Sequence, residues 1–129
     1  MMVETDWNTA GRNWDPAALA ALYTEDALFF GGRPAHSIGA KSIRKYFESY
    51  VGVIDSCSLE LVDQIVIELT SDCVIAQGYG IFCFSLQGKH FTRSRLRTTL
   101  ALAKEGAFWK IRQHHFSAIP EAPPLGEPD

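Results

Sequence analysis

An aspartate, a tyrosine and a histidine interrupt otherwise apolar, strand-like stretches in the second half of the sequence: Asp63, Tyr79 and His115. Imidazole titrates near neutral pH, and an unpaired carboxylate on an apolar face is costly to keep ionised. Asp63 or His115 would act as a general base or acid, and the Tyr79 hydroxyl would stabilise an oxygen that gains charge. We therefore predict these three side chains as catalytic.

Each of the acidic and basic candidates also has a purely structural alternative. For His115 the favoured alternative is a core histidine that bonds to Tyr79 or to backbone, because buried polar groups need partners whether or not they react. A strand bulge would instead turn Asp63 to solvent. Asp26 either looks into the mouth of a cavity or caps a turn, and turn chemistry is favoured. The sequence alone leaves these alternatives open.

Alternating residues predict the strands that would position these groups. Stretches 58–69 and 73–86 alternate as strands, and stretch 91–120 has the pattern of a long antiparallel hairpin. Asp15 followed by Pro16 is a typical helix start, because the carboxylate caps backbone N–H groups and proline suits the first helical position. Helices are predicted over residues 3–12, 16–23 and 40–51.

The register of the strands decides which side chains meet. Two-residue loops, one at Glu105 with Gly106 and one at Gln87 with Gly88, would separate an apolar face from a face rich in arginine. The same register aligns two rows of side chains across all four strands, and these rows would share a cavity. The first row is Asp63, Tyr79, Leu96 and His115, and the second is Ile65, Gln77, Thr98 and Gln113.

Aromatic residues of the predicted helices would complete that cavity. They could wall a pocket for a flat or greasy ligand, with a phenol donating to a carbonyl, although aromatics at helical spacing more often belong to a plain core. Together with the second polar row they give the predicted ligand-binding residues: Gln77, Thr98, Gln113, Trp109, Tyr23, Asp26, Tyr46 and Tyr50.

The overall composition indicates one globular domain with little affinity for polyanions. The chain has 129 residues, of which 47% are hydrophobic and 21% charged, and its net charge is −3. We predict a single domain over residues 1–120, an extended Pro-rich acidic tail over 121–129, no nucleic-acid or membrane partner, and a cytoplasmic location. The arginine face is either solvated or paired with carboxylates of a second subunit, and an RNA-binding stripe is the less favoured alternative.

Ligand-type residues lack the spacing of a metal site. The three cysteines contain no CxxC pair. His114 and His115 are adjacent, so in a strand they point to opposite faces and cannot readily share a metal ion. We predict no metal and no cofactor.

The phrases ALAALYTEDALFF, GAKSIRKYF and WKIRQHHFSAIP resemble the nuclear transport factor 2-like superfamily, above all its SnoaL-like members and the association domain of calcium/calmodulin-dependent protein kinase II. The resemblance covers nearly the whole chain. It implies a cone-shaped α+β fold, with N-terminal helices packed on a strongly curved, mainly antiparallel sheet. It also implies a homodimer or a larger oligomer, usually formed through the outer sheet face. The residues that match are Arg97, Thr99, Trp109, His115, Ser117 and Pro120.

Two functions follow from these residues and this resemblance. The first is a small-molecule-binding, oligomerising domain whose internal pocket holds an apolar organic molecule with a polar group. The alternative is an isomerase, cyclase or dehydratase with an Asp/His acid–base site, as in ketosteroid isomerase-like enzymes. Such an enzyme needs a base and an acidic donor in a dry site, and the predicted sheet offers one carboxylate. That shortage favours binding, while the sequence leaves catalysis undecided.

Overall fold

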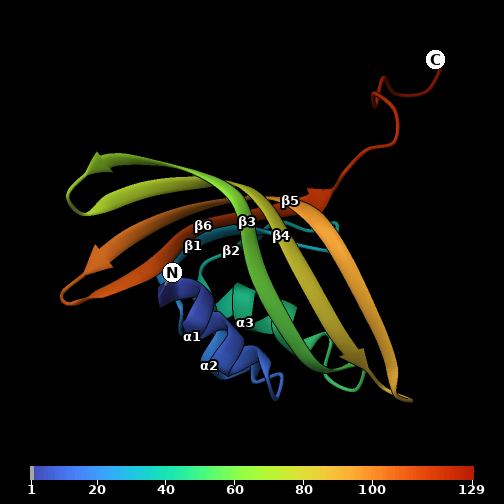
Figure 1. Cartoon of the computed structure of the whole chain (residues 1–129), viewed down its shortest axis with the longest axis horizontal. Helices are drawn as coiled ribbons and strands as arrows, with labels where there is room; N and C mark the ends of the chain where they lie inside the picture. Colours follow the sequence, from blue (N-terminus) through green and yellow to red (C-terminus); the bar gives the residue numbers. More distant parts are fainter. Residues whose placement is uncertain (1) are drawn as a thin grey trace.

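The computed structural model describes residues 2–129, and these form three helices and one curved sheet of six strands. The sheet order is β2-β1-β6-β5-β4-β3, and every neighbouring pair is antiparallel except β1 with β6. The sheet arches over the helices (Figure 1), so the predicted α+β fold is confirmed. The elements are α1 (Met2–Gly11), α2 (Pro16–Ala20), β1 (Tyr23–Phe30), β2 (Ser37–Ile38), α3 (Ala40–Glu48), β3 (Ile54–Thr70), β4 (Cys73–Leu86), β5 (His90–Glu105) and β6 (Phe108–Ala118).

The predicted start of α2 is confirmed, but this helix is shorter than expected. The Asp15 carboxylate accepts a hydrogen bond from the Ala18 N–H at 3.1 Å, and Pro16 opens the helix. The chain then leaves the helix because the Leu22 carbonyl accepts from the Ile111 N–H of β6 at 2.8 Å. Sheet pairing therefore takes over a segment whose local pattern suited a helix. No helix within residues 2–129 has the length and apolar character needed to cross a membrane.

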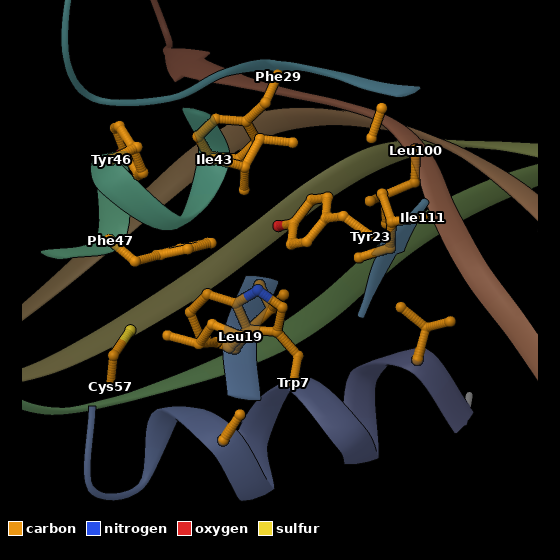
Figure 2. Close-up of a cluster of buried hydrophobic side chains, with 14 of the residues drawn as sticks. Trp7, Leu19, Tyr23, Phe29, Ile43, Tyr46, Phe47, Cys57, Leu100 and Ile111 are labelled. Atoms are coloured by element: carbon orange, nitrogen blue, oxygen red, sulfur yellow. The ribbon is translucent and has the colours of Figure 1, made fainter. Parts of the chain in front are cut away.

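The hydrophobic core lies between the helices and the face of the sheet that looks toward them, which we call the inner face. Aromatic and aliphatic side chains from α1, α2, α3, β1 and the long strands converge there (Figure 2). Trp14 is fixed in it by a hydrogen bond from its indole N–H to the Phe47 carbonyl at 3.0 Å. Fully burying one such large apolar side chain contributes about 1.5–3 kcal/mol. The opposite side of the sheet is the outer face.

The turn between β4 and β5 contains three residues instead of the predicted two. Its last two, Gly88 and Lys89, have left-handed φ angles of 80° and 62°. The extra residue moves β4 by one position against β5, so the predicted pairs of Gln77 and Tyr79 are wrong and both side chains lie on the outer face. The observed outer-face pairs are Ile75 with Ala101, Gln77 with Thr99, and Tyr79 with Arg97.

A bulge at Asp63 divides β3 into two halves, and residues of odd number point to the inner face before the bulge but to the outer face after it. Val62 pairs with Tyr79 and Ile65 pairs with Gln77, so Asp63 and Gln64 together oppose the single residue Gly78, and Asp63 has a left-handed φ of 52°. The predicted pair of Asp63 with Tyr79 is therefore wrong, whereas that of Ile65 with Gln77 is confirmed. The structure bears out the alternative in which a bulge turns Asp63 to solvent.

The Asp63 bulge also decides what the far half of β3 exposes. A Cβ atom at Gly78 would lie 2.5 Å from the Asp63 carbonyl oxygen, so the bulge fits only because β4 carries glycine there. Beyond the bulge, alternate apolar residues leave the inner face and lie on the outer face. Ile65, Ile67 and Leu69 are 70%, 57% and 55% exposed.

A second bulge, in β6, places the two adjacent histidines on the opposite faces from those predicted. The β5–β6 loop is Gly106 and Ala107, one residue later than predicted. Leu102 pairs with Ile111 and Ala101 with Gln113, which leaves Arg112 as an extra residue. Beyond it the faces are inverted relative to the prediction. The resulting pairs are His114 with Leu100 on the inner face and His115 with Thr99 on the outer face, so the prediction that His115 faces inward is wrong.

Candidate functional site: an aromatic inner cavity and an open outer groove

Two hollows lie on opposite faces of the sheet. The first, which we call the inner cavity, has a volume of about 150 Å³ and lies between the helices and the inner face. Its walls are mostly aromatic, from α1, α3 and the sheet, and Trp7 and Phe47 are among those shown in Figure 2. The lining residues are Trp7, Trp14, Gly32, Tyr46, Phe47, Tyr50, Ile54, Phe82, Phe84, Leu96 and Phe116.

Two tyrosines of the third-helix region build the rim of this cavity. The Tyr46 hydroxyl accepts a hydrogen bond from the Gly32 N–H at 2.7 Å, and the Arg33 guanidinium lies 4.2 Å from the centre of the Tyr50 ring. A Cβ at Gly31 would lie 2.5 Å from the Tyr46 hydroxyl, so the glycines let the loop after β1 lie against both rings. Burial raises the pKa of Tyr46, so its hydroxyl stays protonated.

A buried polar pair lies next to the inner cavity. The Tyr23 hydroxyl and His114 Nδ1 are 3.0 Å apart, and both side chains are buried. Burial lowers the pKa of His114 from 6.5 to about 3, with a smaller contribution from neighbouring His115, and burial raises the pKa of Tyr23. Both groups are therefore neutral near pH 7. They can exchange hydrogen bonds with a ligand but carry no charge.

The buried side-chain polar atoms without a hydrogen-bond partner within residues 2–129 are Trp7 Nε1 on the cavity wall, Gln64 Oε1, and two atoms on the inner face near this pair, His114 Nε2 and Thr98 Oγ1. Both belong to fully buried side chains, and buried polar groups in proteins almost always have partners. Phe116 connects them to the cavity. Its ring lines the cavity, lies 5.2 Å from the His114 ring, and belongs to the residue that pairs with Thr98.

The second hollow, which we call the outer groove, is an open trough of about 560 Å³ on the outer face. It gathers five of the predicted catalytic and ligand-binding residues: Asp63, Gln77, Tyr79, Thr98 and His115. They meet on the opposite face of the sheet from the one expected, and Thr98 borders the groove while its side chain is buried. The remaining lining residues are Ile65, Gly78, Arg97, Thr99 and Ser117.

The polar contacts of the outer groove are those of a solvated surface. Arg95 Nη2 lies 3.2 Å from Asp63 Oδ2, and the same guanidinium lies 4.4 Å from the centre of the Tyr79 ring. The Asp63 side chain is 73% exposed, and exposed ion pairs contribute little to stability. Gln77 Nε2 donates to Thr99 Oγ1 at 2.9 Å. Asp63 and His115 therefore do not form the acid–base pair in a dry site that the predicted enzyme requires.

The other predicted site residues are divided among different environments. Tyr46 and Tyr50 line the inner cavity, as expected, whereas Trp109 and Gln113 line neither hollow. Asp26 lies outside, within β1, where it accepts from the Thr24 hydroxyl at 2.9 Å and pairs with Arg112 of β6 at 3.0 Å, so it neither enters the cavity nor caps a turn. Sequence reasoning missed His114, because a strand of unbroken alternation would place it outward.

Comparison with known proteins places the chain in a family. The profile of the SnoaL-like domain matches residues 2–121, while no curated protein is similar enough in sequence to match. Among solved structures, a protein assigned as a calcium/calmodulin-dependent protein kinase II association domain, from Xanthomonas campestris, is 21% identical with a TM-score of 0.79, over 94% of this chain and 83% of that one.

Two further structures have the same fold. A ketosteroid isomerase-like protein from Erwinia carotovora atroseptica is 16% identical with a TM-score of 0.73, over 92% of each chain. A protein assigned as a scytalone dehydratase, from Novosphingobium aromaticivorans, is 14% identical with a TM-score of 0.75, over 99% of this chain and 91% of that one. At these identities the likeness shows the fold alone. The family profile covers nearly the whole chain, and the protein belongs to the SnoaL-like domain family.

Proposed function

We propose that this protein binds a small, largely apolar organic molecule in the inner cavity. The observation that carries the proposal is an aromatic cavity of about 150 Å³ beside two buried polar atoms without partners. An apolar cavity of about 150 Å³ in another protein is large enough to hold benzene. The ligand is therefore the size of a single ring or a short branched chain, and it carries one uncharged polar group.

The polar group of the ligand would meet His114 Nε2 or Thr98 Oγ1. When the Tyr23 hydroxyl donates to Nδ1, the imidazole carries its proton on Nε2 and can donate it to a carbonyl oxygen. The Phe116 ring lies between the cavity and the imidazole, so a ligand that displaces this ring gains both partners. A ketone or aldehyde on an apolar body fits this arrangement best, because it accepts hydrogen bonds and bears no charge.

The alternative is an isomerase, cyclase or dehydratase, and it has less support. No aspartate or glutamate of residues 2–129 lines the inner cavity, and Asp63 is committed to Arg95 on the other face. The base would have to be His114, and an imidazole with a pKa of about 3 is a weak base near neutral pH. We therefore favour recognition of the ligand without its conversion.

Tryptophan fluorescence can test the proposed site directly. Trp7 and Trp14 line the cavity, and replacing the third tryptophan, Trp109→Phe, leaves only their emission. We expect acetophenone to change this emission and to raise the melting temperature, because a ligand that binds only the folded state stabilises it. A Leu96→Trp substitution should fill the cavity and abolish the rise in melting temperature. Unchanged binding in Leu96→Trp would contradict the proposal.

A second pair of variants tests the polar end. Thr98→Val has nearly the same shape but lacks the hydroxyl, so it should weaken acetophenone binding more than ethylbenzene binding. A neutral hydrogen bond contributes about 0.5–1.5 kcal/mol, which corresponds to about a 2- to 12-fold change in the ratio of the two dissociation constants. Thr92→Val, an exposed residue of the same strand, is the matched control and should leave the ratio unchanged. An equal loss for both ligands would leave Thr98 without a role in recognition.

A further inference from the structure

We propose that the outer groove is a second binding site, which holds the carboxylate of a small monocarboxylic acid with an apolar body. The groove lies on the face of the sheet opposite to the inner cavity and is open to solvent. It is therefore independent of the ligand proposed for the cavity. Three features carry the proposal: an arginine without an anionic partner, hydroxyl donors around it, and an apolar wall.

Arg97 supplies the positive charge. The other two arginines near the groove are neutralised, since Arg95 pairs with Asp63 at 3.2 Å and Arg112 pairs with Asp26 at 3.0 Å. No carboxylate of the described chain forms an ion pair with Arg97. Arg97 Nη2 donates a hydrogen bond to the Ser117 hydroxyl oxygen at 3.5 Å, which is long. Most of the guanidinium donors of Arg97 therefore remain available at the groove.

Hydroxyl groups flank this guanidinium at fixed positions in the sheet. Ser117 lies directly across from Arg97 in the β5–β6 ladder, and Thr99 lies two residues along the same face. The Thr99 oxygen accepts a hydrogen bond from Gln77 at 2.9 Å, which leaves the hydroxyl proton of Thr99 free to donate. A planar guanidinium with neighbouring hydroxyl donors matches the two oxygens of a carboxylate.

The charges and walls of the groove select among anions. Asp63 also lines the groove, so two arginines and one aspartate leave a net fixed charge of one positive unit when His115 is neutral. A monoanion brings the net charge of the groove to zero. A dianion such as hydrogen phosphate would leave one uncompensated negative charge beside Asp63. Ile65, which is 70% exposed, and the half-buried Tyr79 ring offer an apolar surface beside the charge. Benzoate has this combination of groups.

Titration of the isotope-labelled protein with sodium benzoate, followed by NMR, tests the proposal. We expect the signals of Arg97 and His115 to shift and to give a saturable binding curve. Arg97→Gln should weaken benzoate at least tenfold, because the exposed side chain can lose its charge without disturbing the core. Arg93→Gln removes one charge from the same face of β5 outside the groove, and it should leave the affinity within twofold.

Two more ligands separate a carboxylate site from a general attraction of anions. Inorganic phosphate should bind at least tenfold more weakly than benzoate in the wild type, and Asp63→Asn should narrow that difference. Benzyl alcohol should leave the groove signals unshifted. An equal loss in Arg97→Gln and Arg93→Gln, or phosphate binding as tightly as benzoate, would overturn the proposal. So would groove signals that respond to protein concentration and not to benzoate, because a second copy of the chain would then cover the groove.

Discussion

Adjacent residues of β6 place the same imidazole ring in two opposite environments. His114 lies on the inner face, fully buried, 3.0 Å from the Tyr23 hydroxyl. His115 lies on the outer face, exposed, with its ring 5.3 Å from that of Phe30. The inner face keeps its polar groups neutral and shields them from water, whereas the outer face keeps its charges solvated and paired. The comparison teaches that one sheet offers an uncharged environment on one face and a charged environment on the other, which is the basis of the two binding sites that we propose.

The largest expected contrast between the two faces is in packing. Phe47→Ala removes a 98% buried ring that contacts the core and the inner cavity, and it should lower the free energy of unfolding by about 3–5 kcal/mol. Phe91→Ala removes a ring that is 79% exposed, and it should change that free energy by less than about 0.5 kcal/mol. Urea unfolding measures both. Similar losses in the two variants would mean that the outer face is covered in solution.

The next largest effect is expected in the pH dependence of the free energy of unfolding, through buried His114 of the inner face. The folded pKa of His114 is about 3, against an ordinary 6.5, so only the unfolded chain takes up this proton between those values. The lowered pKa of His114 therefore makes the free energy of unfolding depend on pH. Its effect is absent above about pH 6.5, and below that value the protein loses about 1.4 kcal/mol of stability per pH unit.

Urea unfolding at pH 6.5 and pH 5 measures this slope. His114→Gln should remove its own part of the slope, whatever the variant's absolute stability. An unchanged slope in His114→Gln would contradict the assignment of this pH dependence to the buried imidazole.

A smaller effect is expected at the Asp63 bulge. Gly78→Ala places a Cβ atom 2.5 Å from the backbone oxygen of Asp63, and it should destabilise the protein by about 1–3 kcal/mol. Gly80→Ala is the control on the same strand, because its Cβ would meet only side-chain atoms of Leu59 and Phe82 at 3.0 and 3.2 Å. Thermal unfolding compares the two. A larger loss of stability in Gly80→Ala would mean that the backbone at the bulge moves to accept a Cβ atom more easily than the inner-face side chains do.

The smallest effect on the free energy of unfolding is expected for a substitution beyond the Asp63 bulge in β3, although it should change the mass of the protein in solution. Assembly into a homodimer through the outer face stays a prediction, and Ile67 and Leu69 are exposed apolar residues of this face that lie outside the outer groove. If two copies pair through this patch, Ile67→Lys should halve the solution mass while the free energy of unfolding of the monomer changes by less than about 0.5 kcal/mol. Light scattering across a range of concentrations measures the mass. A wild-type monomer at all of them would contradict the homodimer.

Local signals were sufficient for much of the fold. The Asp15–Pro16 helix start, the strand over residues 73–86 and the separation of faces within β5 are all present as predicted. Each depends on neighbours along the chain: a cap, a turn, or an alternation of apolar and polar residues. The family resemblance supplied the rest of the architecture, and the profile match confirms it.

The candidate site could not be predicted to the same extent, because one extra residue in a strand inverts every side chain beyond it. The bulge at Asp63 depends on a glycine of the neighbouring strand, Gly78, and the bulge at Arg112 coincides with an ion pair to Asp26 on β1. Neither partner is adjacent in sequence. Five predicted residues did meet in one hollow, but on the solvent side, and His114 replaced His115 inside.

The surplus residue in β6 shows how this fold tolerates a change of chain length. Leu102 pairs with Ile111 and Ala101 with Gln113, so loss of the single codon for Arg112 would leave an unbroken strand with His114 still inside and His115 still outside. The ladder can thus gain or lose one residue at this point while both hollows keep the side chains that line them.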